Sequence, residues 1–323
     1  MTAAPRPSAD TPTLPTSSPT YALPGTVSPL RSVTPAVWAA LAVVYVVWGS
    51  TYLAIRVVVE TMPPFLSATL RFIPAGLLLL ALVAARSGPA ALRVTPRQLG
   101  SAALVGLMLL LGGNGMVVLA ERDVPSGLTA LIIAVVPLWL VLARWVTGHR
   151  PAWTTAVGVL LGLVGLGVLS SSGLSGDVKP LGVALILLAT LSWAGGSFLT
   201  KRLRMPANVF ATSAYEMIAG GLGCLLVAVL KGEPQRFQPA EVSTASWIGL
   251  AFLVVFGSVV AFTAYAWLLQ AAPLPLVATY AYVNPVVAVL LGWLILSEPL
   301  TLPVVLGGAI VVAAVVLVIR TEG

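Results

Sequence analysis

The chain has 323 residues, of which 59% are hydrophobic and only 8% are charged, and its mean hydropathy is +1.02. Soluble domains carry about 25% charged residues, so this composition excludes an ordinary water-facing surface and indicates an integral membrane protein. The net charge of +7 does not indicate nucleic-acid binding, because the cations are spread through short segments between apolar runs. One cysteine and one histidine exclude an intramolecular disulfide and a histidine-rich metal site, and we expect neither metal nor cofactor.

Residues 1–34 differ in composition from the rest of the chain. They hold seven prolines, frequent Ser and Thr and no apolar run, so we predict a disordered tail. Apolar stretches of about 20 residues, each long enough to cross a bilayer, then follow closely. We therefore predict an all-α membrane protein with ten transmembrane helices, at 36–57, 65–85, 99–120, 126–147, 153–170, 180–200, 207–230, 246–268, 275–296 and 302–319.

The distribution of Lys and Arg predicts the orientation of these helices. Cytoplasmic loops of membrane proteins carry an excess of these residues. With the N-terminus in the cytoplasm, that side holds 11 of the 17 cations and the opposite side holds 5, while Arg71 lies inside a helix. We predict a multi-pass protein of the cytoplasmic (inner or plasma) membrane with both termini in the cytoplasm.

The sequence contains a weak internal repeat, which we place at residues 35–171 and 180–319. A shift of 145 residues aligns Trp48 with Trp193 and Gly76 with Gly221, and a shift of 148 aligns Pro137 with Pro285. Five helices per repeat leave the second copy inverted in the membrane relative to the first. Inverted repeats with a substrate site between them are typical of secondary transporters. The alternative is that duplication only built a larger helical bundle.

Several motifs resemble those of a known family. The opening of EamA-type transporters, in the drug/metabolite transporter superfamily, is similar to the run WGSTYLAIR, Trp48–Arg56, and further similarities are Leu70-Arg71-Phe72 and Val124-Pro125-Ser126-Gly127. Two further segments resemble the YedA-like exporters of that family: Gly113-Asn114-Gly115-Met116 and the run YAYVNPVVA, Tyr280–Ala288. The resemblance covers residues 36–319. It implies a ten-helix inner-membrane carrier that exports small metabolites or drugs.

Two ionisable residues lie well inside predicted spans, and the 145-residue shift makes them equivalent: Arg71 and Glu216. Charged side chains within a bilayer are costly and usually face a cavity or a partner. In a functional interpretation, Glu216 binds a proton or a substrate ammonium, and the planar guanidinium of Arg71 binds a substrate carboxylate. In a structural interpretation, the two form an ion pair with each other, or Arg71 extends to the lipid headgroups.

Aromatic residues predict the wall of a substrate pocket. One face of the first helix carries Tyr45, Trp48 and Tyr52. Trp193 occupies the position equivalent to Trp48 in the second repeat. Trp48 and Tyr280 lie too deep in their spans to belong to an interfacial belt. An aromatic pocket suits apolar or cationic cargo. The alternative for each ring is ordinary helix packing.

Deep amides and prolines complete the set of candidate residues. Asn114 and Asn284 either bind cargo or form hydrogen bonds between helices. Pro137 and Pro285 occupy matching positions, where each would free a backbone carbonyl and kink its helix. The candidate pathway residues are therefore Trp48, Tyr52, Arg71, Asn114, Trp193, Glu216, Tyr280 and Asn284.

The rival functions are disfavoured by missing motifs. The sequence has no GxSxG, HExxH or phosphate-loop motif and its aspartates fall in the tail or loops, so we predict neither an enzyme nor an ATP-driven pump. A channel would need a polar ring. We predict a secondary active transporter that exports small metabolites, such as amino acids, or drugs by alternating access; an importer and, less favoured, a channel stay as alternatives. The predicted partners are a small-molecule substrate, protons as the coupling ion and the lipid bilayer, with a homodimer left open and no nucleic acid.

Overall fold

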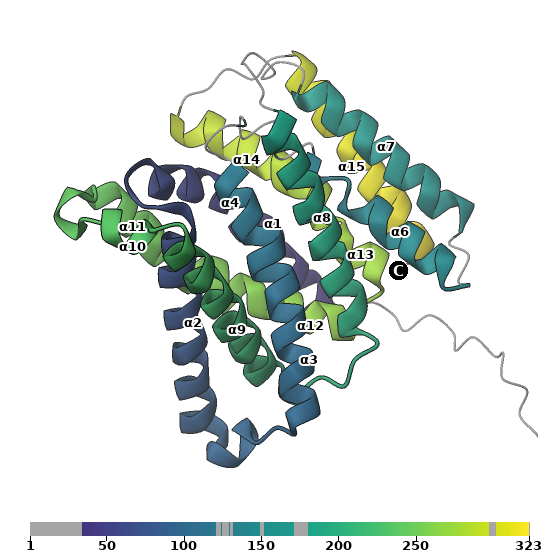
Figure 1. Cartoon of the computed structure of the whole chain (residues 1–323). Helices are drawn as coiled ribbons and strands as arrows, with labels where there is room; N and C mark the ends of the chain where they lie inside the picture. The colour runs from purple at the N-terminus through teal and green to yellow at the C-terminus, as the bar shows by residue number, and fades with distance from the viewer. Residues whose placement is uncertain are drawn as a thin grey trace, which may run out of the picture. The chain divides into compact units, whose positions relative to one another are not determined.

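The computed structural model describes residues 34–120, 124, 129, 132–148, 152–170, 180–296 and 302–322. Every regular element within these residues is a helix, which confirms the all-α prediction for the described part of the chain (Figure 1). The predicted tail, apart from Thr34, lies outside the described residues. So do Pro125 and the first residues of the span predicted at 126–147, Ser126 and Gly127 among them.

Among its described residues, the first half of the chain contains five long or medium helical stretches. Prolines begin the first three, at a position where the missing N–H costs no helical hydrogen bond. The elements are α1 (Pro35–Thr61), α2 (Pro64–Ser87), the short η1 (Pro89–Leu92), α3 (Pro96–Gly106), η2 (Leu107–Gly115), α4 (Met116–Ala120), α6 (Val136–Val146) and α7 (Trp153–Ser170). The segments α3, η2 and α4 join into one continuous helix, Pro96–Ala120.

The second half repeats this order. The elements are α8 (Pro180–Thr200), α9 (Val209–Leu230), the short α10 (Glu233–Arg236) and η3 (Pro239–Glu241), α11 (Thr244–Phe252), η4 (Leu253–Phe262), α12 (Thr263–Ala271), α13 (Leu274–Ala278), α14 (Tyr280–Leu296) and α15 (Leu302–Glu322). The segments α11, η4 and α12 again join into one helix, Thr244–Ala271.

Six helices in the described ranges are long and apolar enough to cross a membrane. Shorter apolar helices lie at Trp153–Gly165, Leu274–Val287 and Val305–Ala314. Many large apolar side chains point outward, for example Leu77, Leu226 and Ile248, each more than half exposed. An outward apolar surface of this kind is what a bilayer requires, so the chain is a multi-pass membrane protein. The count of ten spans stays a prediction.

Two π-helical segments lie at matching positions of the two halves. The segment η2 begins at Leu107 and η4 begins at Leu253, a separation of 146 residues that agrees with the register of the sequence repeat. Each lies within a long helix that is otherwise α-helical. π segments loosen the helical ladder and often occur at functional sites.

The two glycines aligned by the repeat lie at one helix crossing, between α2 and α9, which pack side by side (Figure 1). A Cβ on Gly76 would stand 2.9 Å from the carbonyl oxygen of Ala214, and a Cβ on Gly221 would stand 2.7 Å from Cγ1 of Ile73. Because both positions lack a side chain, the two backbones approach closely. The equivalent helices α7 and α15 also pack against each other.

Candidate functional site

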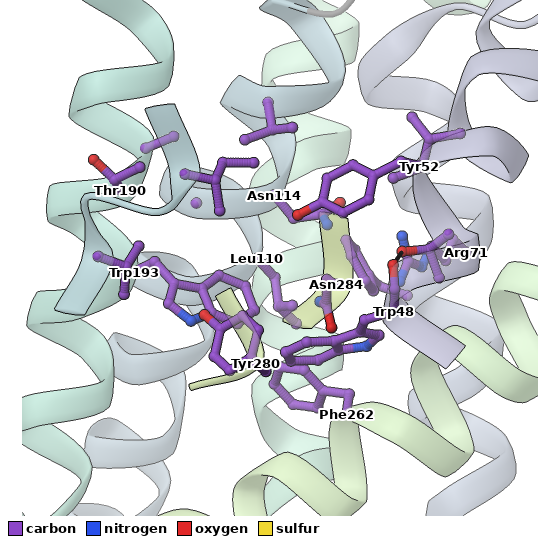
Figure 2. A pocket seen from close by; sticks show the side chains of 18 residues that line it. Trp48, Tyr52, Arg71, Leu110, Asn114, Thr190, Trp193, Phe262, Tyr280 and Asn284 are labelled. Atoms are coloured by element: carbon purple, nitrogen blue, oxygen red, sulfur yellow. Dashed lines mark hydrogen bonds between the residues drawn. The ribbon is translucent and has the colours of Figure 1, made fainter. Parts of the chain in front are cut away.

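A cavity of about 690 Å³, counted together with the open space at its mouth, lies among helices of both halves (Figure 2). The lining comes from α1, α2, η2, α4 and α6 in the first half, with Ile133 just before α6, and from α8, η4 and α14 in the second half. The described lining residues are mostly apolar or aromatic: Trp48, Thr51, Tyr52, Ile55, Arg71, Phe72, Leu110, Gly113, Asn114, Val117, Ile133, Val136, Ala189, Thr190, Trp193, Phe262, Tyr280 and Asn284.

The structure brings seven of the eight candidate pathway residues to this cavity. Those that line it are Trp48, Tyr52, Arg71, Asn114, Trp193, Tyr280 and Asn284. The eighth, Glu216, lies on α9, which contributes no residue to the lining. Their roles in transport stay predictions.

Three aromatic rings form one wall of the cavity, and the N–H groups of the two indoles among them are already engaged. The Trp48 ring centroid lies 5.5 Å from that of Trp193 and 5.2 Å from that of Tyr280, both in edge-to-face arrangements. The indole N–H of Trp48 donates to the carbonyl oxygen of Gly257 (3.1 Å), and that of Trp193 donates to the hydroxyl of Tyr265 (3.1 Å). The two indoles are therefore held in place, with their ring surfaces rather than their N–H groups available to a ligand.

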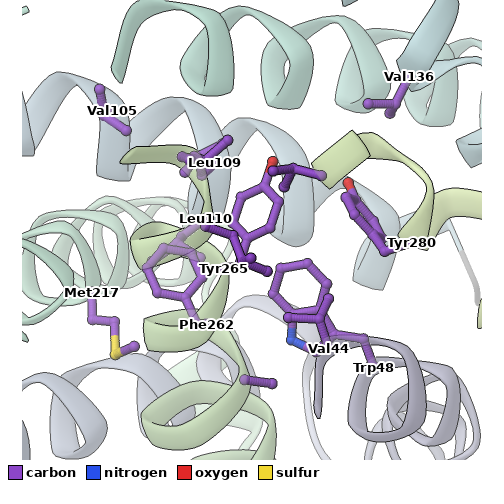
Figure 3. Packing of buried hydrophobic residues seen from close by; sticks show 14 of the residues in the cluster. Val44, Trp48, Val105, Leu109, Leu110, Val136, Met217, Phe262, Tyr265 and Tyr280 are labelled. Carbon is purple, nitrogen blue, oxygen red and sulfur yellow. The ribbon is translucent and has the colours of Figure 1, made fainter. Parts of the chain in front are cut away.

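A buried aromatic and aliphatic core supports this wall. Tyr265, which is 1% exposed, lies beside Trp48 and Phe262 in Figure 3. Its hydroxyl forms a 2.7 Å hydrogen bond with Ser197 in addition to the bond from Trp193. The core thus joins η4, α8 and α1 behind the cavity and fixes the positions of the rings.

Arg71 lines the cavity from α2 and is 6% exposed, so it does not extend to the membrane surface. Its Nε donates to the hydroxyl of Ser258 on η4 (2.9 Å), and its guanidinium carbon lies 4.9 Å from the centroid of the Phe72 ring. A Cβ on Gly257 would stand only 3.1 Å from Nη2 of Arg71, so the glycine leaves room for the guanidinium. Figure 2 shows Arg71 and Tyr52 on the side of the cavity opposite Thr190 and Trp193.

Glu216 is 1% exposed, and its Oε2 has no hydrogen-bond partner among the described residues. The backbone of Glu216 packs directly against Gly106 of α3. A Cβ added at Gly106 would overlap the carbonyl oxygen of Glu216. Arg71 and Glu216 form no ion pair with each other in this structure. The two equivalent charged residues therefore have different surroundings, one facing the cavity and the other enclosed between helices.

The amides and prolines are placed as follows. Asn284 is 1% exposed, and in the orientation that satisfies its neighbours its NH₂ group donates to the carbonyl oxygens of Tyr280 (3.1 Å) and Tyr45 (3.2 Å). Asn114 lies in η2, and its Oδ1 has no partner among the described residues. Pro285 is inside α14, whereas Pro137 is the second residue of α6 and follows a turn at 134–135.

Sequence reasoning missed some residues of the site, and the repeat could have found one of them. Applying the 145-residue shift to the aromatic face of α1 gives Thr190, Trp193 and Ser197 on α8. Thr190 lines the cavity and accepts a hydrogen bond from Trp139 (3.1 Å), and Ser197 supports Tyr265. No comparable sequence signal marks Ser258 as the partner of Arg71.

A helical multi-pass membrane protein with a cavity lined by both of its halves has the architecture of a membrane transporter. The comparisons with known proteins agree: the model of the EamA-like transporter family matches the chain twice, over residues 27–171 and 180–320. The chain belongs to this family.

Named relatives support the assignment, and a solved structure shares the fold. The chain is 41% identical over 282 residues to the "Uncharacterized inner membrane transporter YedA" of Escherichia coli K12, covering 86% of this chain and 89% of that protein. It is 25% identical to the "Uncharacterized transporter YvbV" of Bacillus subtilis, covering 86% and 90% of the two chains. A solved crystal structure with 21% identity has a TM-score of 0.73 and covers 91% of this chain and 98% of that chain, a likeness of fold alone.

Proposed function

We propose that this transporter is a secondary carrier that exports small organic molecules, either amino acids or amphipathic drugs, across the cytoplasmic membrane by alternating access. The proposal includes ten membrane spans in two inverted five-helix repeats, with both termini in the cytoplasm. The observation that carries it is the cavity, because helices from both halves contribute its lining. A binding site at the interface of two repeats can open to either side as the halves exchange conformations.

The matched features of the two halves support this mechanism. The π segments η2 and η4 lie in the equivalent long helices, and both contribute residues to the cavity, Leu110 from one and Phe262 from the other. Trp48 of the first half bonds to Gly257 in η4, and Ser192 of the second half donates to the carbonyl of Met108 in η2 (2.8 Å). Each half therefore holds the π segment of the other, an arrangement suited to a reversible exchange.

Protons are the proposed coupling ion, and Glu216 is the proposed proton site. An unpaired carboxylate at this depth is costly in its charged form. Since Glu216 lies outside the cavity lining, binding of a proton fits its position better than contact with a substrate ammonium. Its burial inside the helical bundle would couple its charge to the packing of the surrounding helices.

Two alternatives lead to different measurements. An importer of the same molecules would use the same fold with the gradient reversed. A channel is less favoured, because only one charged side chain is present among the described residues of the cavity wall, where a selective pore requires a polar or charged ring. The lipid bilayer is the proposed environment of the protein, and assembly into a homodimer is a further proposal.

Counterflow in proteoliposomes tests the carrier directly. Vesicles containing the purified protein are loaded with unlabelled amino acids, and in a second series with lipophilic drugs, and labelled compound is added outside. Transient accumulation of one label above protein-free vesicles is the expected result. Equal leakage of every label would instead indicate a pore, and no movement of any label would contradict the carrier.

A further inference from the structure

The charge of the cavity narrows the class of substrate. Arg71 is the one charged residue among the described residues that line it, and none of these is acidic. Building on the carrier function proposed above, we propose that the cavity binds a small organic monoanion: a carboxylate attached to a flat apolar body, with the carboxylate on Arg71 and the body against Trp48, Trp193 and Tyr280.

The guanidinium of Arg71 is available for such a ligand. One of its N–H groups, Nε, is used by Ser258, and the described residues offer no carboxylate to the rest of the group. The side chain is 94% buried and faces a cavity rather than water or headgroups. A buried cation without a counter-ion is expensive, and an anionic ligand removes that cost. The planar group presents parallel N–H donors that match the two oxygens of a carboxylate.

The rest of the lining determines the remainder of the ligand. Both indole N–H groups are occupied, so Trp48 and Trp193 offer apolar surface. Phe262 and Val136 extend this surface. A flat hydrocarbon or aromatic body buries the most area against such rings. Since one cation lines the described wall, a ligand with a single negative charge is neutralised, whereas a polyanion would keep uncompensated charge against a mostly apolar lining.

The same observations disfavour a lipophilic cation. Aromatic rings attract cations, by about 0.5–2 kcal/mol per contact. Against this stands repulsion by Arg71 within a site of low dielectric, where like charges interact far more strongly than in water. The carboxylate that would offset the repulsion, Glu216, does not line the cavity.

Binding to the purified full-length protein in detergent tests this inference without requiring transport. The probes are 3-phenylpropionate, 3-phenylpropanol and 3-phenylpropylamine, and the same three end groups on an indole body, titrated by calorimetry. The proteins are the wild type, Arg71→Gln and the control Arg204→Gln, which removes an exposed arginine between α8 and α9. Thermal unfolding of each protein verifies that it is folded.

For at least one of the two ring systems, phenyl or indole, the wild type and Arg204→Gln should bind the carboxylate about tenfold or more tightly than the alcohol. Both proteins should bind the amine most weakly. Arg71→Gln should weaken carboxylate binding by about tenfold to a hundredfold and leave the alcohol within about twofold. The inference is overturned if the amine binds as well as the carboxylate, if folded Arg71→Gln binds the carboxylate like the wild type, or if no probe binds. In that case, counterflow of amines or neutral molecules would still support the proposed carrier function. If a carboxylate binds in an Arg71-dependent way but the same carboxylate shows no counterflow, the binding site is supported and the carrier function is contradicted.

Discussion

The contact between α3 and α9 permits a sharp test of the packing, at Gly106. A Cβ at this position would overlap the carbonyl oxygen of Glu216 and stand 2.6 Å from its Cα. Because these are backbone atoms, no rotamer change relieves the contact, and the two helices must separate. Gly100, earlier on the same helix α3, has nothing within 4 Å of the corresponding Cβ and provides a matched control.

Overpacking of a close contact costs about 1–3 kcal/mol. Alanine recovers about 0.5–1 kcal/mol relative to glycine within a helix. We therefore expect Gly106→Ala to destabilise the protein by about 1 kcal/mol, the difference between the mid-range values, and Gly100→Ala to be neutral or stabilising by up to about 1 kcal/mol. The assay is the thermal unfolding midpoint of the purified variants in one detergent. The reasoning is refuted if Gly106→Ala unfolds at or above the temperature of Gly100→Ala.

Three further outcomes are expected. Glu216→Gln should abolish proton-driven accumulation and retain counterflow, and normal accumulation in this variant would argue against a coupling role. Tyr45→Phe removes a 2.6 Å hydrogen bond to Thr279 and should lower stability by about 1 kcal/mol in the same unfolding assay, and an unchanged midpoint would show that this bond contributes nothing. At Lys201, whose ammonium donates to the carbonyl of Ala272 (2.6 Å), burial lowers the pKa below the usual 10.5. The unfolded chain then holds this proton to higher pH than the folded protein, so the stability of the wild type relative to Lys201→Met should rise as pH approaches 10.5, and a flat or falling difference would contradict that pKa direction.

The sequence predicted the cavity residues that are chemically conspicuous. A charge, an amide or a deep tryptophan stands out within an apolar span, and Arg71, Asn114 and Trp48 all line the cavity. The repeat register also located a backbone contact, because Gly76 and Gly221 are aligned in sequence and lie at one crossing.

Other features leave no trace in hydropathy. The π segments are mostly apolar, like the helices on either side of them, so their composition does not distinguish them from α-helix. The break at Thr279 between α13 and α14 lies within a single predicted span, 275–296. The repeat also suggested that Arg71 and Glu216 would be equivalent, yet the cavity draws on α2 and not on α9. A symmetry of sequence therefore does not fix which of two matched side chains faces the site.

The measurement that tests the central claim most directly is counterflow through a deliberately filled cavity. Val117 lines the cavity from α4, whereas Leu104 on α3 of the same long helix is 45% exposed on the outer surface. With a substrate established by counterflow of the wild type, Leu104→Trp should transport normally and Val117→Trp should lose counterflow while staying folded. If folded Val117→Trp protein instead shows counterflow at the wild-type rate, the substrate does not pass through this cavity.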